Sequence, residues 1–522
     1  YTFDKRYTAR LTMRADGSSK FAEDKRWGYF PSAALAWTLS EEKFMENLMP
    51  AISFLKLRLS YGEAGNNRID DFRYLTQFSA DAFYSIGDQL ITVFTPLGLA
   101  NSNLKWETTI SRNLGIDVGF LNDRLGLTLD FYRNTTRDLL VNVPVPTSSG
   151  YTQQLQNIGA TSNTGFELQL NGTPVQSRDF VWRANFNISF NKNKVEKLGE
   201  FQDAALFSSG WGGGAMPSDF LVRVGEPVGT IWGLITDGYY TLDDFDYAGG
   251  AYTLKAGVAN NSSVTATTPQ PGVLKFKDIS GPDGKPDGEI NDFDRTIIGN
   301  TQPKFFGGLN QQFSYKNWDL SIFMNFQVGN DVYNANKLEF TSGYTINSNI
   351  LTMMNDRWRT IDAQGNIVTD PAALAELNKN ATLWQPLRSA ASFYVHSWAI
   401  EDGSFLRINN VTLGYSLPRK LSSRLKINNF RIYATVNNLY VLTNYSSYDP
   451  EVNTRRGSPL TPGVDYSAYP RSRSRCFARS WSTIPGLRPI CSRRVFAGPG
   501  SPRRNLPLSR PPDSGLKTRM PR

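Results

Sequence analysis

The chain has 522 residues, of which 13% are aromatic and 43 are glycine, and its formal net charge is +9. This length exceeds that of one ordinary soluble domain, and the aromatic, Gly and Asn content favours an all-β chain over a helical one. No run of about 18 apolar residues occurs, which excludes a membrane-spanning helix but not a barrel, because barrel strands are short and alternating.

The positive charge is confined to the C-terminal end. From Arg471 onward there are thirteen Lys and Arg residues and one acid, Asp513, so residues 1–470 carry about three more acidic than basic residues. This distribution argues against a nucleic-acid partner for the main body. Both cysteines, Cys476 and Cys491, lie in the same end, so neither a disulfide framework nor a cysteine-based zinc site is indicated.

Strands are predicted along the chain by alternation of apolar and polar residues. At residues 7–14, Tyr7, Leu11 and Met13 share one face, and threonine and arginine occupy the other. Because this pattern starts almost at Tyr1, with no apolar signal-peptide core before it, we expect that the start of the protein is missing. The same alternation predicts strands over 55–61, 113–120, 125–132, 166–170, 182–190, 318–326 and 430–436.

The connections between these strands differ greatly in length. Short turns at 121–124, 174–179 and 316–317 alternate with long connections at 62–105, 195–300 and 330–400. Many strands reach about nine to eleven residues, the length that crosses a bilayer at a tilt. Aromatic residues at strand ends, such as Trp27, Tyr29 and Trp37, are typical of an interfacial girdle. The pattern favours a membrane barrel, with a multi-domain soluble β protein as the alternative.

Motifs spread over residues 1–473 resemble one family in their order along the chain. They include RADGSSKF (14–21), LKLRLSYGEAGN (55–66), NLKWETT (103–109), DFYRNTTRDLL (130–140), IGATSNTGFELQL (158–170), VGEPVGTIWGLITDGYY (224–240), DGEINDFDRTIIGN (287–300), YKNWDLSIFMNFQVGNDVYN (315–334), EDGSFLRINNVTLGYSLP (401–418), RIYATVNNLYVLTNYSSYDPEV (431–452) and YPRSR (469–473). Taken together, they resemble the SusC/RagA-like family of TonB-dependent outer-membrane receptors.

The resemblance implies an all-β fold, namely part of a large antiparallel transmembrane barrel with long extracellular loops. Such transporters have 22 strands around a plugged lumen. About eleven strands can be read here, so residues 1–473 are expected to be a partial barrel that lacks the plug domain and the signal peptide. An open barrel edge leaves backbone groups without partners in a bilayer. The sequence is therefore expected to be partial.

The resemblance also implies a role in the outer membrane and no enzymatic activity. The expected function is TonB-energised import of a bulky nutrient, foremost an oligosaccharide and alternatively a peptide. The expected partners are a SusD-like surface lipoprotein, the TonB complex through the missing N-terminal region, and outer-membrane lipid. The alternatives are a passive porin or adhesin barrel, or a soluble β-rich carbohydrate-binding protein.

Residues 474–522 depart from the family pattern. Where a final aromatic-rich strand is expected, the chain becomes rich in Pro, Arg and Ser and loses its alternation. We expect a disordered tail or translation in a shifted reading frame. A basic tail that binds nucleic acid or anionic lipid is the alternative.

The segment 278–294 resembles an EF-hand calcium loop. Asp283, Asp287 and Asp294 would be its first, fifth and twelfth positions, and the Glu289 carbonyl would supply the seventh. Lys285 at the third position and an aspartate at the twelfth argue against calcium. The alternative is an acidic, Gly-rich turn held by side-chain to backbone hydrogen bonds.

Aromatic residues in the long connections are candidates for stacking on sugar rings, and the alternative is that they pack the loops together. These residues are Phe83, Tyr84, Trp211, Trp232, Tyr239, Tyr240 and Tyr344. The only histidine, His396, offers no support for a histidine-based catalytic triad or a histidine-rich metal site. No cofactor other than calcium is indicated.

Overall fold

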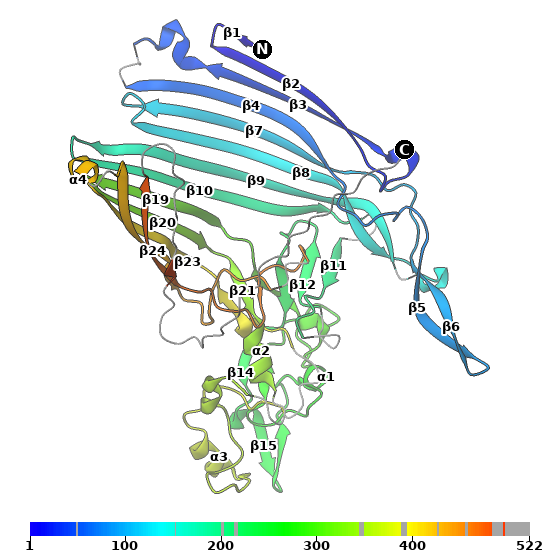
Figure 1. The fold of residues 1–522 in the computed structure, drawn as a ribbon. Helices are drawn as coiled ribbons and strands as arrows, with labels where there is room; N and C mark the ends of the chain where they lie inside the picture. Colours follow the sequence, from blue (N-terminus) through cyan, green and yellow to red (C-terminus); the bar gives the residue numbers. More distant parts are fainter. Residues whose placement is uncertain are drawn as a thin grey trace.

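The structure is a computed structural model of the chain, and it describes residues 1–47, 51–151, 153–199, 203–212, 218–343, 349–387, 394–424, 427–454, 458–482 and 494–495. Its main element is an antiparallel sheet of fourteen strands that curves into an open wall (Figure 1). In sheet order, the strands are β1 (Thr2–Phe3), β2 (Tyr7–Gly17), β3 (Trp27–Thr38), β4 (Ile52–Asn66), β7 (Glu107–Phe120), β8 (Leu125–Pro144), β9 (Gln153–Gln176), β10 (Phe180–Lys197), β19 (Phe305–Tyr315), β20 (Trp318–Val328), β23 (Phe405–Ser416), β24 (Asn429–Thr443), β26 (Ser474–Ser482) and β27 (Arg494–Val495).

All eight segments predicted from alternation lie within strands of this sheet. Twelve of its described strands have nine residues or more, long enough to cross a bilayer. At one end the strands are joined by tight turns, including the turn after β7, where Leu121, Asn122 and Asp123 all have positive φ. At the other end lie the long connections, as predicted. No helix among the described residues is long and apolar enough to span a membrane.

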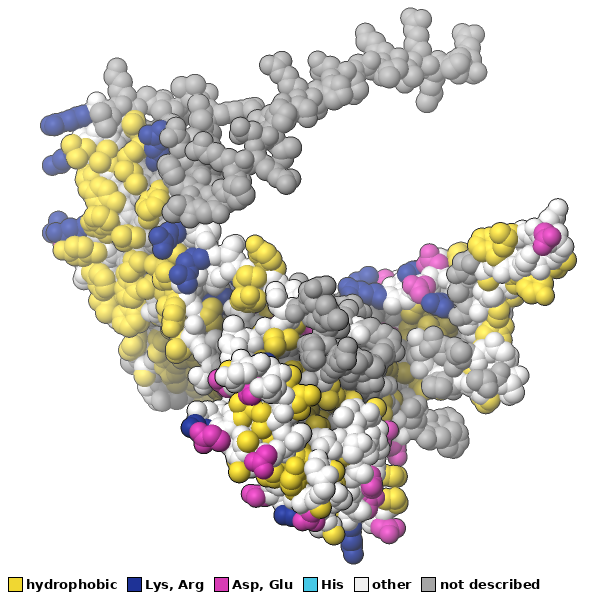
Figure 2. All heavy atoms as spheres, turned by 90° about the horizontal axis from the view of Figure 1, so that it is seen from below, with side chains coloured by type: hydrophobic (Ala, Val, Ile, Leu, Met, Phe, Trp, Pro, Cys, Tyr) yellow, Lys and Arg dark blue, Asp and Glu magenta, His cyan; other side chains and the backbone are white. Residues whose placement is uncertain are grey.

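The outer face of the wall is apolar and exposed. Leu59, Leu114 and Phe131 lie side by side in the cross-strand register of β4, β7 and β8, and their exposed fractions are 56, 40 and 47%. Hydrophobic side chains cover the wall in Figure 2, whereas acidic side chains gather on the loop-bearing part. Large apolar side chains arrayed on an exposed wall are what a lipid-facing barrel surface requires.

The inner face is polar and contains ion pairs that cross strands. Arg58 on β4 lies 2.8 Å from Asp117 and 3.2 Å from Asp130, which is two strands away on β8. Between them stands Gly115, where a Cβ atom would lie 2.5 Å from the Arg58 guanidinium carbon. This glycine therefore leaves the space through which the arginine reaches Asp130.

A second glycine leaves space for an ion pair between other strands of the wall. Arg431 on β24 is paired with Asp319 on β20, and Gly414 on the strand between them would place a Cβ within 2.6 Å of both side chains. Glycine weakens a strand because it has no side chain to pack. At these two positions it lets an ion pair join strands that are not neighbours.

Three long connections fold into a separate structure at one end of the wall, below the sheet in Figure 1. The described parts of 198–304, 329–404 and 444–473 are here called the loop lobe. Its strands are β11 (Ala204–Phe207), β12 (Phe220–Arg223), β13 (Thr230–Gly233), β14 (Thr236–Tyr239), β15 (Phe245–Ala248), β16 (Ala251–Leu254), β17 (Leu274–Phe276), β18 (Thr296–Asn300), β21 (Asp331–Asn334), β22 (Ile400–Asp402) and β25 (Val464–Asp465). Its helices are α1 (Ser262–Thr265), α2 (Ala335–Ser342) and α3 (Pro371–Leu377), while α4 (Arg419–Arg424) lies at the tight-turn end.

The loop lobe has its own hydrophobic cores. One core joins all three connections, and its buried residues are Trp211, Phe220, Ile231, Tyr333, Ala335, Leu338, Val395, Ala399 and Val464. Pairing of β21 with β22 and with β25 also links the second and third connections. A further connection, between β4 and β7, forms the hairpin of β5 (Gln77–Ile86) and β6 (Gln89–Gly98), which extends away from the wall (Figure 1).

The first nine residues of the expected C-terminal tail form a strand in the structure, whereas the shifted reading frame stays a prediction. Ser474–Ser482 form β26, which pairs with β24 and continues the wall beyond residue 473. The register pairs Arg475 with Val436 and Arg479 with Ile432, so both arginines lie on the apolar outer face. Because an arginine at the bilayer midplane costs about 2–4 kcal/mol, β26 is poorly suited to face lipid. Beyond Ser482, all but Arg494–Val495 lies outside the described residues.

Candidate functional site

Two of the seven aromatic residues proposed for sugar stacking are enclosed in the loop lobe. Trp211 is 3% exposed and its indole N–H donates to the Tyr333 hydroxyl at 2.8 Å. Tyr240 is fully buried and donates to the Ala259 carbonyl at 2.6 Å. Their ring faces are therefore unavailable to a ligand, and these two predictions are wrong because both rings serve the lobe's cores.

The other stacking candidates differ in accessibility. Trp232 and Tyr239 are half-buried, and Tyr239 donates to the Ala381 carbonyl at 3.0 Å. Phe83 and Tyr84 are 66 and 63% exposed on the β5–β6 hairpin, so both rings are open to solvent. Tyr344 lies outside the described residues. Phe83 and Tyr84 are thus the two candidates best placed for stacking.

The calcium-like loop does not gather its predicted ligands. Asp294 is buried, and its carboxylate accepts hydrogen bonds from the backbone N–H groups of Ile279, Ser280 and Asn291. Asp283, Asp287 and Glu289 are exposed in the preceding turn. Within the described ranges, no three acidic, His or Cys side chains form a group that could hold a metal ion. The calcium site stays a prediction, whereas Asp294 has a structural role.

His396 lies at the centre of an aromatic cluster in the lobe. It is fully buried. The centre of its ring lies 5.6 Å from the ring centre of Phe276, 5.7 Å from that of Trp384 and 6.3 Å from that of Trp398. Burial lowers the pKa of His396 to about 3, so the ring is neutral at physiological pH. Its Nδ1 is 2.6 Å from the Thr236 hydroxyl. The histidine therefore packs the lobe as an aromatic residue.

A buried ion pair that was not anticipated from sequence fastens the third connection to the wall. Arg407 on β23 is 1% exposed and its Nη2 lies 2.6 Å from Asp449, which is 4% exposed. Its Nη1 also donates to Asn438 at 2.7 Å. Arg471 lies 3.5 Å from Asp449 and 2.9 Å from Glu451. Arg407 occupies an inward position in an alternating strand, but nothing in the sequence identifies Asp449 as its partner.

A second unanticipated cluster joins helix α2 to β22. Lys337 lies 3.2 Å from Glu401, and its ammonium group stands 3.9 Å from the centre of the Trp398 ring. Burial disfavours the charged form of Glu401, but hydrogen bonds from Ser446 and the charge of Lys337 outweigh it and lower the pKa of Glu401. A cavity of about 560 Å³ lies beside this cluster and is lined by residues of α2, 351–353, 446–448 and 467–468.

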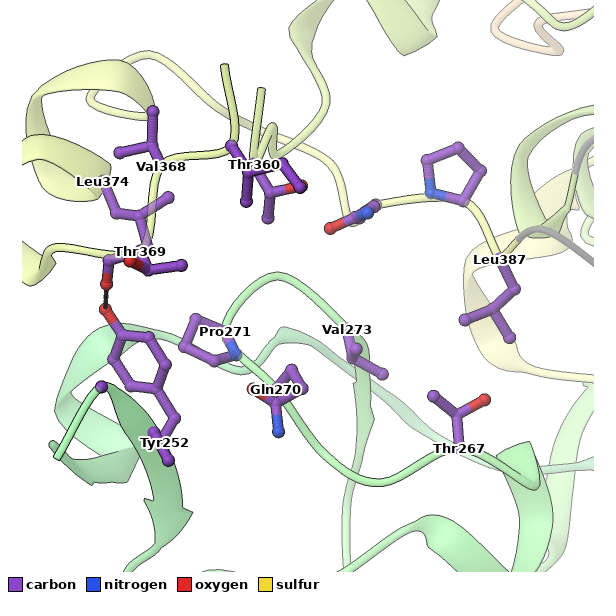
Figure 3. Close-up of a pocket in the computed structure, with 15 residues that line it drawn as sticks. Tyr252, Thr267, Gln270, Pro271, Val273, Thr360, Val368, Thr369, Leu374 and Leu387 are labelled. Atoms are coloured by element: carbon purple, nitrogen blue, oxygen red, sulfur yellow. Dashed lines mark hydrogen bonds between the residues drawn. The ribbon is translucent and has the colours of Figure 1, made fainter. Parts of the chain in front are cut away.

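Two adjoining cavities lie at the far end of the loop lobe from the wall. One has a volume of about 600 Å³ and lies between residues 267–273 and 360–387 (Figure 3). The other has a volume of about 690 Å³ and is lined mainly by residues 355–362. Both are lined by Thr360, Gln385 and Pro386, so the two cavities adjoin at these residues.

A buried acid in the lobe gives it a pH-dependent stability. Burial raises the pKa of Asp219 from 3.8 to about 6, although hydrogen bonds from Ser209 oppose the shift. The folded lobe therefore holds this proton more tightly than the unfolded chain. The stabilisation from this group is complete below pH 3.8 and is lost as pH rises through about 6.

We expect the variant Asp219→Asn to remove this dependence. Between pH 4 and pH 7, the unfolding free energy of the parent should fall by about 2 kcal/mol more than that of the variant. Thermal unfolding of the purified full-length receptor at both pH values measures the difference. An equal pH slope in parent and variant would show that another group is responsible.

Comparisons with known proteins agree with this architecture. Residues 1–439 match the family described as "TonB dependent receptor-like, beta-barrel". The chain belongs to this family of TonB-dependent receptors. The family is located in the outer membrane and its members are receptors rather than enzymes, which confirms both predictions.

Individual TonB-dependent receptors match most of the chain. The chain is 34% identical to TonB-dependent receptor P3 of Formosa agariphila over 91% of its own length and 44% of the relative. It is 32% identical to TonB-dependent receptor SusC of Bacteroides thetaiotaomicron over 90% of its length and 42% of that receptor. The resemblance to the SusC/RagA branch is thereby confirmed. The chain spans less than half of the curated relatives it matches.

Solved structures confirm the fold. The structure of the RagAB peptide transporter superposes with a TM-score of 0.69 at 23% identity, covering 91% of this chain and 46% of that one. The open wall with its loop lobe is thus the barrel fold of this branch of the TonB-dependent receptors.

Proposed function

We propose that this chain forms the barrel wall and outer loops of a receptor that imports a bulky nutrient across the outer membrane with energy from TonB. The observation that carries the proposal is the architecture of the wall. Its outer face is apolar, its inner face bears cross-strand ion pairs such as that of Arg58 and Asp117, and its long connections fold into a lobe at one end. A polar inner wall with a folded lobe at its mouth suits capture and passage of a polar molecule.

The proposed partners are a SusD-like surface lipoprotein over the loop lobe and the TonB complex at the opposite end of the barrel. The proposed nutrient is an oligosaccharide or a peptide. Aromatic residues in the loops favour an oligosaccharide, and Phe83 and Tyr84 on the exposed hairpin support that choice. Trp211 and Tyr240 are buried, so these two rings do not support an oligosaccharide.

Uptake by cells with and without TonB tests the proposal. Cells that produce the full-length receptor containing this chain, together with a SusD-like lipoprotein, are given fluorescent oligosaccharides and fluorescent peptides. We expect uptake of one class, and its loss when TonB is deleted. Uptake that continues without TonB would identify a passive porin instead. Absence of uptake of either class in TonB-containing cells would contradict a role in importing these nutrients.

The exposed hairpin permits a more specific test of sugar binding. Replacing both Phe83 and Tyr84 by alanine should weaken binding of an oligosaccharide substrate by about thirtyfold, since stacking contacts of this kind contribute about 1 kcal/mol for each ring. Phe78, also exposed on the same strand, provides the control as Phe78→Ala. Equal effects of the two variants would show that the hairpin needs apolar residues in general and not these rings.

A further inference from the structure

The two adjoining cavities at the end of the loop lobe have different chemistry. We call the two together the tip groove, defined by the residues that line the 600 Å³ chamber and the 690 Å³ chamber. Among the described residues, no charged side chain lines the first chamber. The second is lined by Arg357, Arg359 and Asp362. A ligand that fills the groove therefore has a neutral part and a charged part.

The first chamber suits an apolar side chain next to an amide backbone. Its walls include Pro271, Val273 and Leu374, and its polar groups are uncharged hydroxyls and amides such as Thr267 and Gln270, as Figure 3 shows. Aliphatic walls with a few placed polar groups are typical of sites for partly apolar ligands. Sugar rings would need many hydrogen-bonding groups and an open aromatic face.

The aromatic residues of the groove are already engaged. The Tyr252 hydroxyl donates to the Thr369 carbonyl at 2.9 Å and thereby joins the two sides of the first chamber (Figure 3). Trp358 in the second chamber is only 5% exposed, and the backbone of Gly272 lies directly against its pyrrole ring. Trp358 therefore has no free ring face for carbohydrate stacking, and the ring of Tyr252 is half-buried beside Tyr247, with 4.8 Å between the ring centres.

The two arginines of the second chamber have no acidic partner among the described residues. Arg357 donates to the Met354 carbonyl at 2.8 Å, and Arg359 donates to the Asn355 carbonyl at 2.6 Å. Each guanidinium group has five N–H donors, so both retain donors for a further acceptor. The planar fork of arginine matches a carboxylate in geometry and charge.

The one acid that lines the second chamber is bound within its own turn. Asp362 accepts hydrogen bonds from the backbone N–H groups of Gln364 and Asn366 and from the side chain of Asn366. It forms no ion pair with the arginines in the described structure. The charges of Arg357 and Arg359 are thus not neutralised locally.

The Trp358 side chain supplies an additional, independent indication of a missing ligand. Its indole nitrogen is buried and has no hydrogen-bond partner in the described structure. Buried polar groups in folded proteins are rarely left in this state.

We propose that the tip groove binds the C-terminal end of a peptide, with an apolar side chain in the first chamber and the terminal carboxylate on Arg357 and Arg359. The inference rests on the proposed function, and it selects the peptide over the oligosaccharide that the exposed rings of Phe83 and Tyr84 favour, because the tip groove is a formed cavity and those rings stand open to solvent on a hairpin. It also places a capture site at the end of the loop lobe remote from the wall. An acidic oligosaccharide, which has a carboxylate but lacks an aliphatic side chain, is the competing ligand.

The test compares ligands that differ only at the carboxylate. Full-length receptor in lipid nanodiscs is titrated with a fluorescent hexapeptide ending in two leucines and with its C-terminal amide. A neutral hexasaccharide and one ending in glucuronate are titrated in parallel. We expect the free acid to bind at least about tenfold more tightly than the amide, and both saccharides to bind more weakly than the free acid.

Variants then assign the effect to the arginines. The double variant Arg357→Gln/Arg359→Gln should bind the free acid about as weakly as the parent binds the amide, so that the difference between acid and amide disappears. The variant Arg357→Lys/Arg359→Lys keeps both charges and should keep part of the difference in affinity between acid and amide. It therefore tests the arginines even if the glutamine variant does not fold. Arg223→Gln, at an exposed arginine of the lobe paired with Glu226, is the control and should change nothing.

Two results would overturn the inference. Equal affinity of the acid and the amide would show that no carboxylate site exists, and arginine-dependent binding of the glucuronate saccharide in preference to the peptide would assign the groove to acidic glycans. The assay contains no TonB, so it separates this inference from the proposed function. Loss of uptake with intact peptide binding would contradict only the transport role.

Discussion

Replacement of Arg407 by leucine is expected to destabilise the attachment of the third connection by about 3–5 kcal/mol, because Asp449 would keep a buried charge without its main partner. The pair is almost fully enclosed, with 1 and 6% exposure of the two side chains. Arg471 stands 3.5 Å from Asp449 and cannot reproduce the shorter contact. Residues 444–473 should therefore separate from the wall.

Limited proteolysis and thermal unfolding of the full-length receptor measure this loss. New cleavage within 444–473 and a lower unfolding temperature are expected for Arg407→Leu. The matched control is Arg223→Leu, which removes an exposed arginine of the lobe and should cost less than about 1 kcal/mol. The double variant Arg407→Leu/Asp449→Leu should recover part of the stability, since neither charge is then left buried. Equal effects of Arg407→Leu and Arg223→Leu would mean that the pair does not fasten the connection.

Valine in place of Gly115 is expected to destabilise the wall by about 1–3 kcal/mol, because its side chain needs the space of the Arg58 guanidinium group. The Cβ alone would stand 2.5 Å from the guanidinium carbon. The arginine would have to leave Asp117 and Asp130, which costs the ion pairs in addition to the clash. The temperature at which the folded barrel loses its compact migration on a detergent gel reports the change.

Two further variants separate crowding from a general effect of valine. Gly126→Val alters the inner face of the same hairpin at a position where the nearest atom to a Cβ is 3.8 Å away, so it should have little effect. Arg58→Ala combined with Gly115→Val removes the obstructing group, and the two changes together should cost less than the sum of the two alone. Strict additivity would show that Arg58 and the residue at 115 do not meet.

Eight of the twelve long strands could be predicted because lipid on one face and water on the other enforce alternation along them, whereas β3, β19 and β23 were not among the predicted segments. Leu114 and Phe131, for example, lie on the outer face that the pattern assigns to them. Strand β26 was not predicted, because Arg475 and Arg479 occupy positions on its outer face where the alternation requires apolar residues. Alternation thus identifies a strand only where its outward-facing residues are apolar.

The loop lobe could not be predicted in detail because its strands are short and its contacts are distant in sequence. Strands of two to five residues are too brief for a period to be read. Trp211 and Tyr333 are 122 residues apart, and Arg407 and Asp449 are 42 apart. An aromatic residue in a long connection is therefore as consistent with a core position as with a binding platform, and Trp211 and Tyr240 proved to be core residues.

The central claim is that the outer face of the wall contacts lipid while the inner face lines a polar lumen. Spin labels at Leu59 and at Ser60, in a full-length receptor with both cysteines replaced by serine, test it directly in the outer membrane. These neighbouring residues point to opposite faces of β4. We predict that lipid-soluble oxygen relaxes the label at 59 and that a water-soluble nickel chelate relaxes the label at 60. Relaxation of both labels by the nickel chelate would contradict a membrane-embedded wall.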